Sequence, residues 1–106
     1  MVKVREIKFM CQAVKWFDKL NGHTYHSVRI TRNTDGAVVV GAFAYGYGDQ
    51  YRYTALEKMA GAGWLPSKYS YKNNTLYLFE RENNYPINWI VSQGLKRECI
   101  ANGVIN

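Results

Sequence analysis

The chain has 106 residues, of which 47% are apolar, so it is long enough for one domain, expected to span 1–106, and too apolar for a disordered chain. No apolar run approaches the roughly 18 residues of a membrane span, and the charged segment MVKVREIKFM lacks the apolar region of a signal peptide. We therefore expect a soluble, cytoplasmic protein with no membrane partner. Its net charge of +6 favours an anionic partner.

The first half of the sequence predicts a three-stranded antiparallel meander. Apolar and polar residues alternate over 4–18 and again over 24–32, as in half-buried strands. Asn21 and Gly22 between them are typical of a two-residue type I′ turn, in which both residues have positive φ. The next strand, 37–45, is apolar on both faces. We expect it either to be central in the sheet and covered on both sides, or to lie under a helix.

The middle of the sequence predicts a helix over 50–61. Asp49 is placed to cap its first amides, and the segment 61–66, with a C′ glycine, an apolar residue after it and then Pro66, is expected to end it. Its apolar residues fall on one face at helical spacing. They are Ala55, Leu56, Met59 and Ala60.

The last third of the chain allows two interpretations. In the first, 75–81 and 87–91 are the strands of a hairpin, and Ser92 caps a final helix. In the second, 85–101 is one long helix with Pro86 in its first turn. The alternation of apolar residues along both predicted strands favours the hairpin. The apolar residues of the final helix are Leu95, Cys99 and Ile100.

These elements predict a single α+β domain in the order β-β-β-α-β-β-α: a three-stranded antiparallel meander, a helix, a β-hairpin and a C-terminal helix. An exposed edge strand of such a meander favours pairing between subunits, so a homo-oligomer is one expected state.

The sequence offers no metal, cofactor or catalytic site. Cys11 and Cys99 are far apart and fall on apolar faces, so we expect two buried thiols rather than zinc ligands, which come at short paired spacings. His23 and His26 are three apart on a strand, which places them on opposite faces. Neither has a nucleophile or carboxylate at a recognisable spacing. We therefore do not expect an enzyme.

The segment YGYGDQY, residues 45–51, is the candidate site. Its glycines let backbone amides approach a ligand, the following helix N-terminus attracts anions, and its tyrosines can stack on bases. If Arg32 pairs with Ala37, Tyr25 lies opposite Ala44 at the same end of the sheet. A structural explanation also stays open, in which the segment is a tight turn. The candidate ligand-binding residues are Tyr25, His26, Arg29, Tyr45, Tyr47, Gly48, Asp49, Gln50, Tyr51 and Arg52.

The segments KWFDKLNGHTYHSVRIT and YGYGDQYRYTALEKMAGAGWLP resemble a group of small bacteriophage and prophage proteins of unknown role. The resemblance covers residues 15–66 best. It implies a phage accessory protein in the cytoplasm of a bacterial host, where proteins of this size often antagonise defence. The expected function is non-enzymatic binding of a nucleotide signal or nucleic acid. The alternative is an anti-CRISPR-like inhibitor of a host defence protein, and the sequence does not separate the two.

Overall fold

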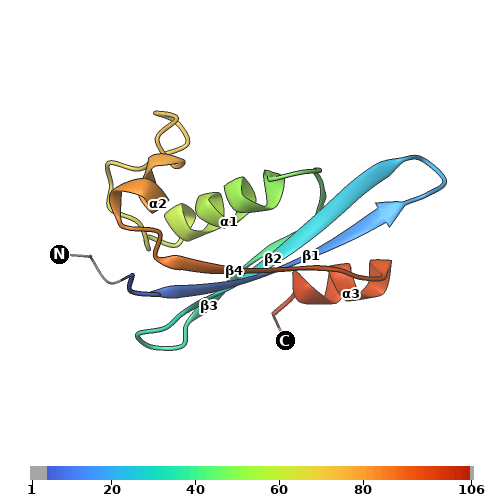
Figure 1. Ribbon diagram of the computed structural model, residues 1–106, viewed down its shortest axis with the longest axis horizontal. Helices are drawn as coiled ribbons and strands as arrows, with labels where there is room; N and C mark the ends of the chain where they lie inside the picture. The colour runs from blue at the N-terminus through green and yellow to red at the C-terminus, as the bar shows by residue number, and fades with distance from the viewer. Residues whose placement is uncertain (1–4, 106) are drawn as a thin grey trace.

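The computed structural model describes residues 5–105 and places one four-stranded sheet between helices (Figure 1). The strand order is β3-β2-β1-β4, with β4 parallel to β1 and the other pairs antiparallel. Helices α1 and α2 lie on one face of the sheet and α3 on the other. The predicted α+β class is confirmed, but the sheet is mixed. The elements are β1 (Phe9–Asp18), β2 (His23–Arg32), β3 (Val38–Tyr45), α1 (Gln50–Gly61), α2 (Leu78–Glu82), β4 (Ile87–Gln93) and α3 (Lys96–Asn102).

The main core lies between the sheet and α1. Alternate residues of β1 and β2 point to this face, and α1 covers them with the apolar stripe that its spacing predicts. The bounds of α1 confirm the predicted helix over 50–61. Three of the four residues in its predicted apolar stripe are buried, and the fourth, Ala60, is half-buried. The buried apolar residues of these three elements are Phe9, Cys11, Ala13, Val28, Ile30, Tyr51, Ala55, Leu56 and Met59.

β3 is an edge strand, so its predicted central position is wrong. The sheet extends instead through β4, which pairs with β1 and makes β1 and β2 the central strands. The alternative prediction, that this strand lies under a helix, is confirmed, because α1 and α3 contact β3 from opposite faces. In the described chain β3 and β4 are the two edges, and pairing of subunits through an edge stays a prediction.

A β-bulge changes the expected register of β2 and β3. The Arg32 amide donates to the Ala37 carbonyl at 2.8 Å, as predicted. Further along, β3 has two residues between Gly41 and Ala44 where β2 has one between Val28 and His26. As a result Tyr25 pairs with Tyr45 rather than lying opposite Ala44.

Glycines with positive φ shape the turn between β1 and β2 and the end of α1. The β1–β2 loop has four residues, 19–22, and among them Gly22 alone has positive φ (70°), so the type I′ turn is wrong. After α1 the C′ glycine predicted within 61–66 is Gly63 (φ 77°), and the apolar residue Trp64 follows it. The Trp64 amide then donates to the Met59 carbonyl at 2.9 Å, which closes the helix end.

The prediction of a strand over 75–81 as the first half of a C-terminal hairpin is wrong, because this segment contains most of the short helix α2. Leu76 and Phe79, three residues apart, are both buried, a spacing that suits a helical turn better than a strand. The second strand is confirmed as β4, and the single helix over 85–101 is therefore wrong. Ser92 lies within β4 and caps nothing, because α3 begins only at Lys96.

α3 is held on the sheet mainly by polar contacts. Of its predicted apolar stripe Cys99 alone is buried, while Leu95 and Ile100 are exposed. The buried Ser27 hydroxyl donates to the Cys99 carbonyl at 2.5 Å, and the Asn102 side-chain amide donates to the Gln12 carbonyl at 3.1 Å. A search for apolar periodicity does not detect this attachment.

Both cysteines are free and buried, as predicted. Burial, with a smaller contribution from the negative charge of Glu80, raises the pKa of Cys11 to about 12. Burial also raises the pKa of Cys99.

Within residues 5–105 no group of three or more His, Cys, Asp and Glu side chains is placed to hold a metal ion. Val4, the first residue of the predicted strand 4–18, lies outside the described residues. Across that same described range, no helix combines the length and apolar character needed to span a bilayer.

Candidate functional site

The sheet divides the predicted site residues into two groups. Tyr25 and Tyr45 face α3, where their rings are in contact, and Arg29 donates from the same face to the Val104 carbonyl beyond α3. His26 bonds to α1, and Tyr51 and Arg52 belong to α1. The segment 46–50 connects the two faces. The predicted residues therefore do not form one pocket.

An aromatic cluster covers the α3 face at the β1–β2 hairpin end. Tyr25 and Phe43 are stacked with ring centroids 4.9 Å apart, and Trp16 packs against both. Lys96 of α3 lies 5.4 Å above the Trp16 ring, and Tyr45 is 56% exposed at the rim. Because the rings largely cover one another, their main effect is to stabilise the protruding hairpin.

The glycines of YGYGDQY allow a tight crossing between the faces. A Cβ at Gly46 would lie 2.7 Å from the His26 ring and 2.5 Å from the Gln50 side chain. Gly48 has φ 61°, and its carbonyl accepts a hydrogen bond from Lys15 Nζ at 2.8 Å. The structural explanation therefore accounts for both glycines, while a role in ligand binding stays a prediction.

The predicted cap by Asp49 is wrong. Asp49 occupies the N-cap position of α1, but its side chain makes no capping hydrogen bond. Its φ of −89° and ψ of 11° differ from the extended backbone of most N-cap residues. Asp49 and Gln50 are exposed, and Tyr47 is 71% exposed. These side chains form a solvated rim at the start of α1.

His26 is a buried structural residue. Its Nδ1 lies 3.2 Å from the Gly46 carbonyl and its Nε2 lies 2.8 Å from the Thr54 hydroxyl. A carbonyl only accepts, so Nδ1 carries the proton of the neutral ring and Nε2 accepts from Thr54. Burial, reinforced by the positive charge of Lys15, lowers the pKa of His26.

This lowered pKa predicts a loss of stability in mild acid. As pH falls below about 6.5, the unfolded chain protonates His26 before the folded chain does, so the free energy of unfolding decreases. We expect the urea midpoint to be lower at pH 5.0 than at pH 7.5. In His26→Gln this difference should shrink, although the variant is less stable overall. An equal pH dependence in both proteins would contradict the assignment.

The functional side chains that the structure does bring together are basic and aromatic, on the α1 face beside β4. Tyr51 packs edge-on against Trp89 with centroids 5.6 Å apart. Lys15 Nζ lies 4.9 Å from the Tyr51 ring, and the Arg52 guanidinium lies 5.3 Å from the Trp89 ring. Arg52 Nε donates to the Tyr51 hydroxyl at 3.2 Å, but its two terminal amino groups make no hydrogen bond within residues 5–105.

A pocket of about 370 Å³ opens beside this cluster; we call it the Arg52–Trp89 pocket. The Trp89 indole N–H donates to Glu80 at 2.9 Å, and Arg5 donates to the Tyr85 and Ile87 carbonyls at 2.6 and 2.7 Å. These bonds hold Trp89 and Arg5 in fixed positions. The residues lining the pocket are Arg5, Arg52, Glu80, Tyr85 and Trp89.

Tyr85 adopts an unusual backbone conformation in this pocket. Its φ is 53°, a left-handed value that costs a bulky L-residue about 1–2 kcal/mol. The residue is nevertheless 51% exposed rather than buried in compensation. Strained residues with exposed functional groups are found preferentially at binding and active sites. This conformation therefore marks the pocket as a candidate site.

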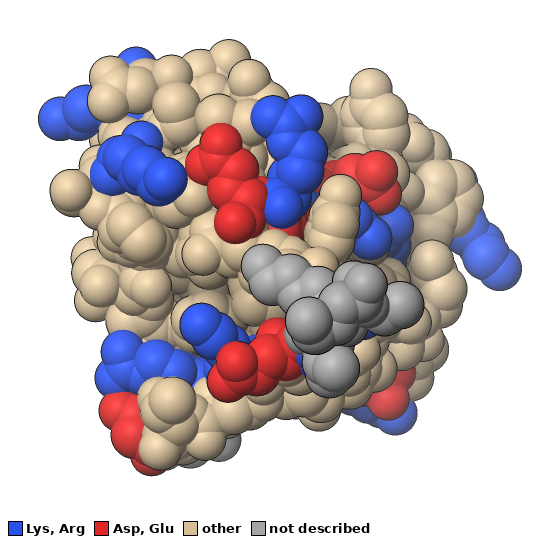
Figure 2. Space-filling view, turned by 60° about the vertical axis from the view of Figure 1, so that its left-hand side comes forward, with Lys and Arg blue, Asp and Glu red and all other residues tan. Residues whose placement is uncertain are grey.

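Charges around this end of the molecule are mixed. Figure 2 shows Lys and Arg side chains interspersed with Asp and Glu rather than gathered into one basic patch. The net charge of +6 thus does not by itself define a binding surface here. Contact with an anion would depend on individual side chains such as Arg52.

Of the predicted residues, Tyr51 and Arg52 belong to the basic–aromatic cluster, and Arg52 lines the pocket. Sequence reasoning missed Arg5, Lys15, Tyr85 and Trp89, because pairing of β4 with β1 brings them to α1.

A comparison of the chain with protein-family models, curated proteins and solved structures finds no match.

Proposed function

We propose that the protein is a non-enzymatic binder of a nucleotide or of single-stranded nucleic acid, and that the Arg52–Trp89 pocket holds one nucleotide unit. The observation that carries this proposal is Tyr85, with its strained backbone and half-exposed side chain, beside an arginine whose terminal amino groups make no hydrogen bond within residues 5–105. Aromatic rings and guanidinium planes are the groups on which proteins stack unpaired bases.

The parts of the pocket match the parts of a nucleotide. Its volume of about 370 Å³ lies in the range of small-ligand sites. The terminal amino groups of Arg52 can donate to a phosphate in the paired geometry that guanidinium favours, and the Tyr85 ring offers a face to a base. Glu80 is engaged by the Trp89 indole and keeps the pocket from being strongly positive. We therefore expect contact with one phosphate rather than several.

The test is the titration of isotope-labelled protein with AMP and with a 12-nucleotide oligothymidine. Both ligands are expected to shift the Trp89 indole N–H resonance, which is assigned with Trp89→Phe. The oligonucleotide affinity should fall with salt at a slope near −0.7 per phosphate contact for a single strand. If neither ligand moves this resonance at low salt, the proposal is wrong.

Replacing Tyr85 separates binding from folding. Tyr85→Asn is expected to be as stable as the parent or up to about 1 kcal/mol more stable, because asparagine tolerates left-handed backbone. The same change should weaken oligonucleotide binding by about 1–3 kcal/mol, the usual contribution of one stacked base. Urea unfolding and fluorescence anisotropy measure the two effects. A variant that is stable and binds normally would remove Tyr85 from the site.

A second candidate function is inhibition of a host defence protein, in the phage setting that the sequence resemblance implies. All nine tyrosines lie in the described chain, and six of them are more than one third exposed. A single ligand pocket would not use so many exposed tyrosines. Tyrosine is favoured at protein–protein hot spots. This function predicts that a protein partner protects these tyrosines and that nucleotides bind nowhere. The exposed residues are Tyr45, Tyr47, Tyr53, Tyr71, Tyr77 and Tyr85.

A further inference from the structure

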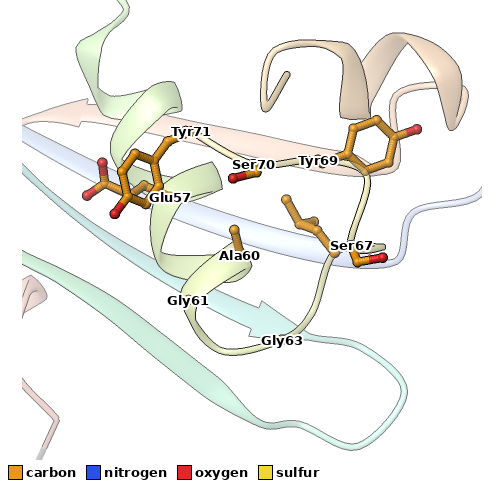
Figure 3. A pocket seen from close by; sticks show the side chains of 9 residues that line it. Glu57, Ala60, Gly61, Gly63, Ser67, Tyr69, Ser70 and Tyr71 are labelled. Carbon is orange, nitrogen blue, oxygen red and sulfur yellow. The ribbon is translucent and has the colours of Figure 1, made fainter. Parts of the chain in front are cut away.

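A second pocket, separate from the Arg52–Trp89 pocket, lies between the C-terminal half of α1 and the loop that follows it (Figure 3). Its volume is about 380 Å³. We call it the Glu57 pocket after the one charged residue that lines it. The residues lining it are Glu57, Ala60, Gly61, Gly63, Leu65, Ser67, Tyr69, Ser70 and Tyr71.

The Glu57 carboxylate has no compensating partner in the described part of the chain. Within residues 5–105 it makes no hydrogen bond or ion pair, although the protein carries a net charge of +6. Its neighbour Lys58 packs towards Gly41 of β3, away from the pocket. Lys68 on the loop is engaged by Glu82 at 3.7 Å. Glu57, a half-buried residue, therefore lines the pocket with no cation paired to its carboxylate among the described residues.

The helix end adds to this negative potential. The pocket is beside the last turn of α1, where the helix dipole is equivalent to about half a negative charge. A Cβ at Gly61 or Gly63 would meet no atom within 4 Å, so the backbone here is open to a ligand. The pocket thus combines a carboxylate with a helix C-terminus, both of which attract cations.

The remaining walls are mostly apolar and aromatic, and Ser67 and Ser70 add two hydroxyl groups. Leu65 is buried at one side, Ala60 is half-buried, and the Tyr71 ring is more than half exposed beside Glu57 in Figure 3. Apolar walls suit an alkyl chain, and the face of a tyrosine ring attracts an ammonium or guanidinium group. These walls do not suit a hydrated metal ion, which needs several oxygen ligands.

We propose that the Glu57 pocket binds an organic cation: an ammonium or guanidinium group on a short alkyl chain. The cationic group pairs with the Glu57 carboxylate beside the Tyr71 ring, and the chain lies against Leu65 and Ala60. Two sources share this chemistry, a free amine or the Lys or Arg side chain of a partner protein. The pocket shares no residue with the Arg52–Trp89 pocket, so the proposal stands independently of nucleotide binding.

The experiment is an amide chemical-shift titration at low salt with matched probes. They are n-butylguanidinium, n-butylammonium and the anion butyrate, together with the peptide Gly-Gly-Arg-Gly-Gly. Both cations are expected to give saturable shifts at Gly61, Gly63 and Ser70, and butyrate none. Tighter binding of the peptide than of butylguanidinium would indicate a protein partner, and equal or weaker binding a free amine.

Glu57→Gln keeps the shape of the side chain and removes its charge. It should weaken cation binding about tenfold, the usual effect of losing a charged hydrogen-bond partner. Glu6→Gln, which removes the same charge at an exposed position outside both pockets, should bind as the parent does. The proposal is overturned if Glu57→Gln binds the cations normally, if butyrate shifts the same amides, or if no probe gives saturable shifts.

Discussion

Replacing Arg52 by glutamine is expected to weaken binding of a single-stranded oligonucleotide about tenfold, the effect of losing roughly 1.4 kcal/mol. Arg52 is exposed, so its removal should leave the fold intact. Its guanidinium is oriented by the Tyr51 hydroxyl and the Trp89 ring, and neither terminal amino group makes a hydrogen bond to a described residue. Loss of one phosphate contact should also make the slope of log affinity against log salt shallower by about 0.7. Fluorescence anisotropy at three salt concentrations measures both effects.

Arg97→Gln is the matched control, because it removes one charge from an exposed position on α3. If binding depends on net charge alone, Arg52→Gln and Arg97→Gln will weaken it equally, and the pocket assignment will be wrong. Arg29→Gln tests a third arginine, which sequence reasoning placed in the site and the structure places on the opposite face. We expect this variant to behave like Arg97→Gln.

Elements that depend on local pattern could be predicted from the sequence. The helix over 50–61 follows from its apolar spacing, and the first three strands follow from alternation and turn residues. The segment containing α2 could not be predicted in this way. Its alternating Leu76 and Leu78 fit a strand equally well over so short a stretch, and the helical form is selected by burial of Leu76 and Phe79 in the core.

The site depends on contacts between distant parts of the chain. Tyr51 and Arg52 could be proposed because a tyrosine- and glycine-rich turn precedes a helix. Their partners Lys15 and Trp89 are brought together by the parallel pairing of β1 with β4, which no local pattern encodes. The β-bulge in β3, which pairs Tyr25 with Tyr45, is likewise not indicated by the local sequence pattern.

The position of α1, and hence of Tyr51 and Arg52, depends on Gly41 in β3. A Cβ at this residue would lie 2.7 Å from Thr54 Cγ2 and 2.8 Å from Val28 Cγ2. Val28 is in the middle of the core and cannot move aside, so the added atoms would push Thr54 and α1 away from the sheet. Thr54 also bonds to the buried His26, which would then lose its partner.

Gly41→Val is therefore expected to lower the free energy of unfolding by about 1–3 kcal/mol through overpacking and by about 1–3 kcal/mol more through the unpaired His26. Urea unfolding followed by tryptophan fluorescence measures this loss. Gly61→Ala is the control within α1: its methyl group meets no atom within 4 Å, and alanine should stabilise the helix by about 0.5–1 kcal/mol. The two variants should thus change stability in opposite directions. An unchanged urea midpoint for Gly41→Val would mean that α1 does not pack on β3 as described, and the orientation of Arg52 over Trp89 would then lose its structural basis.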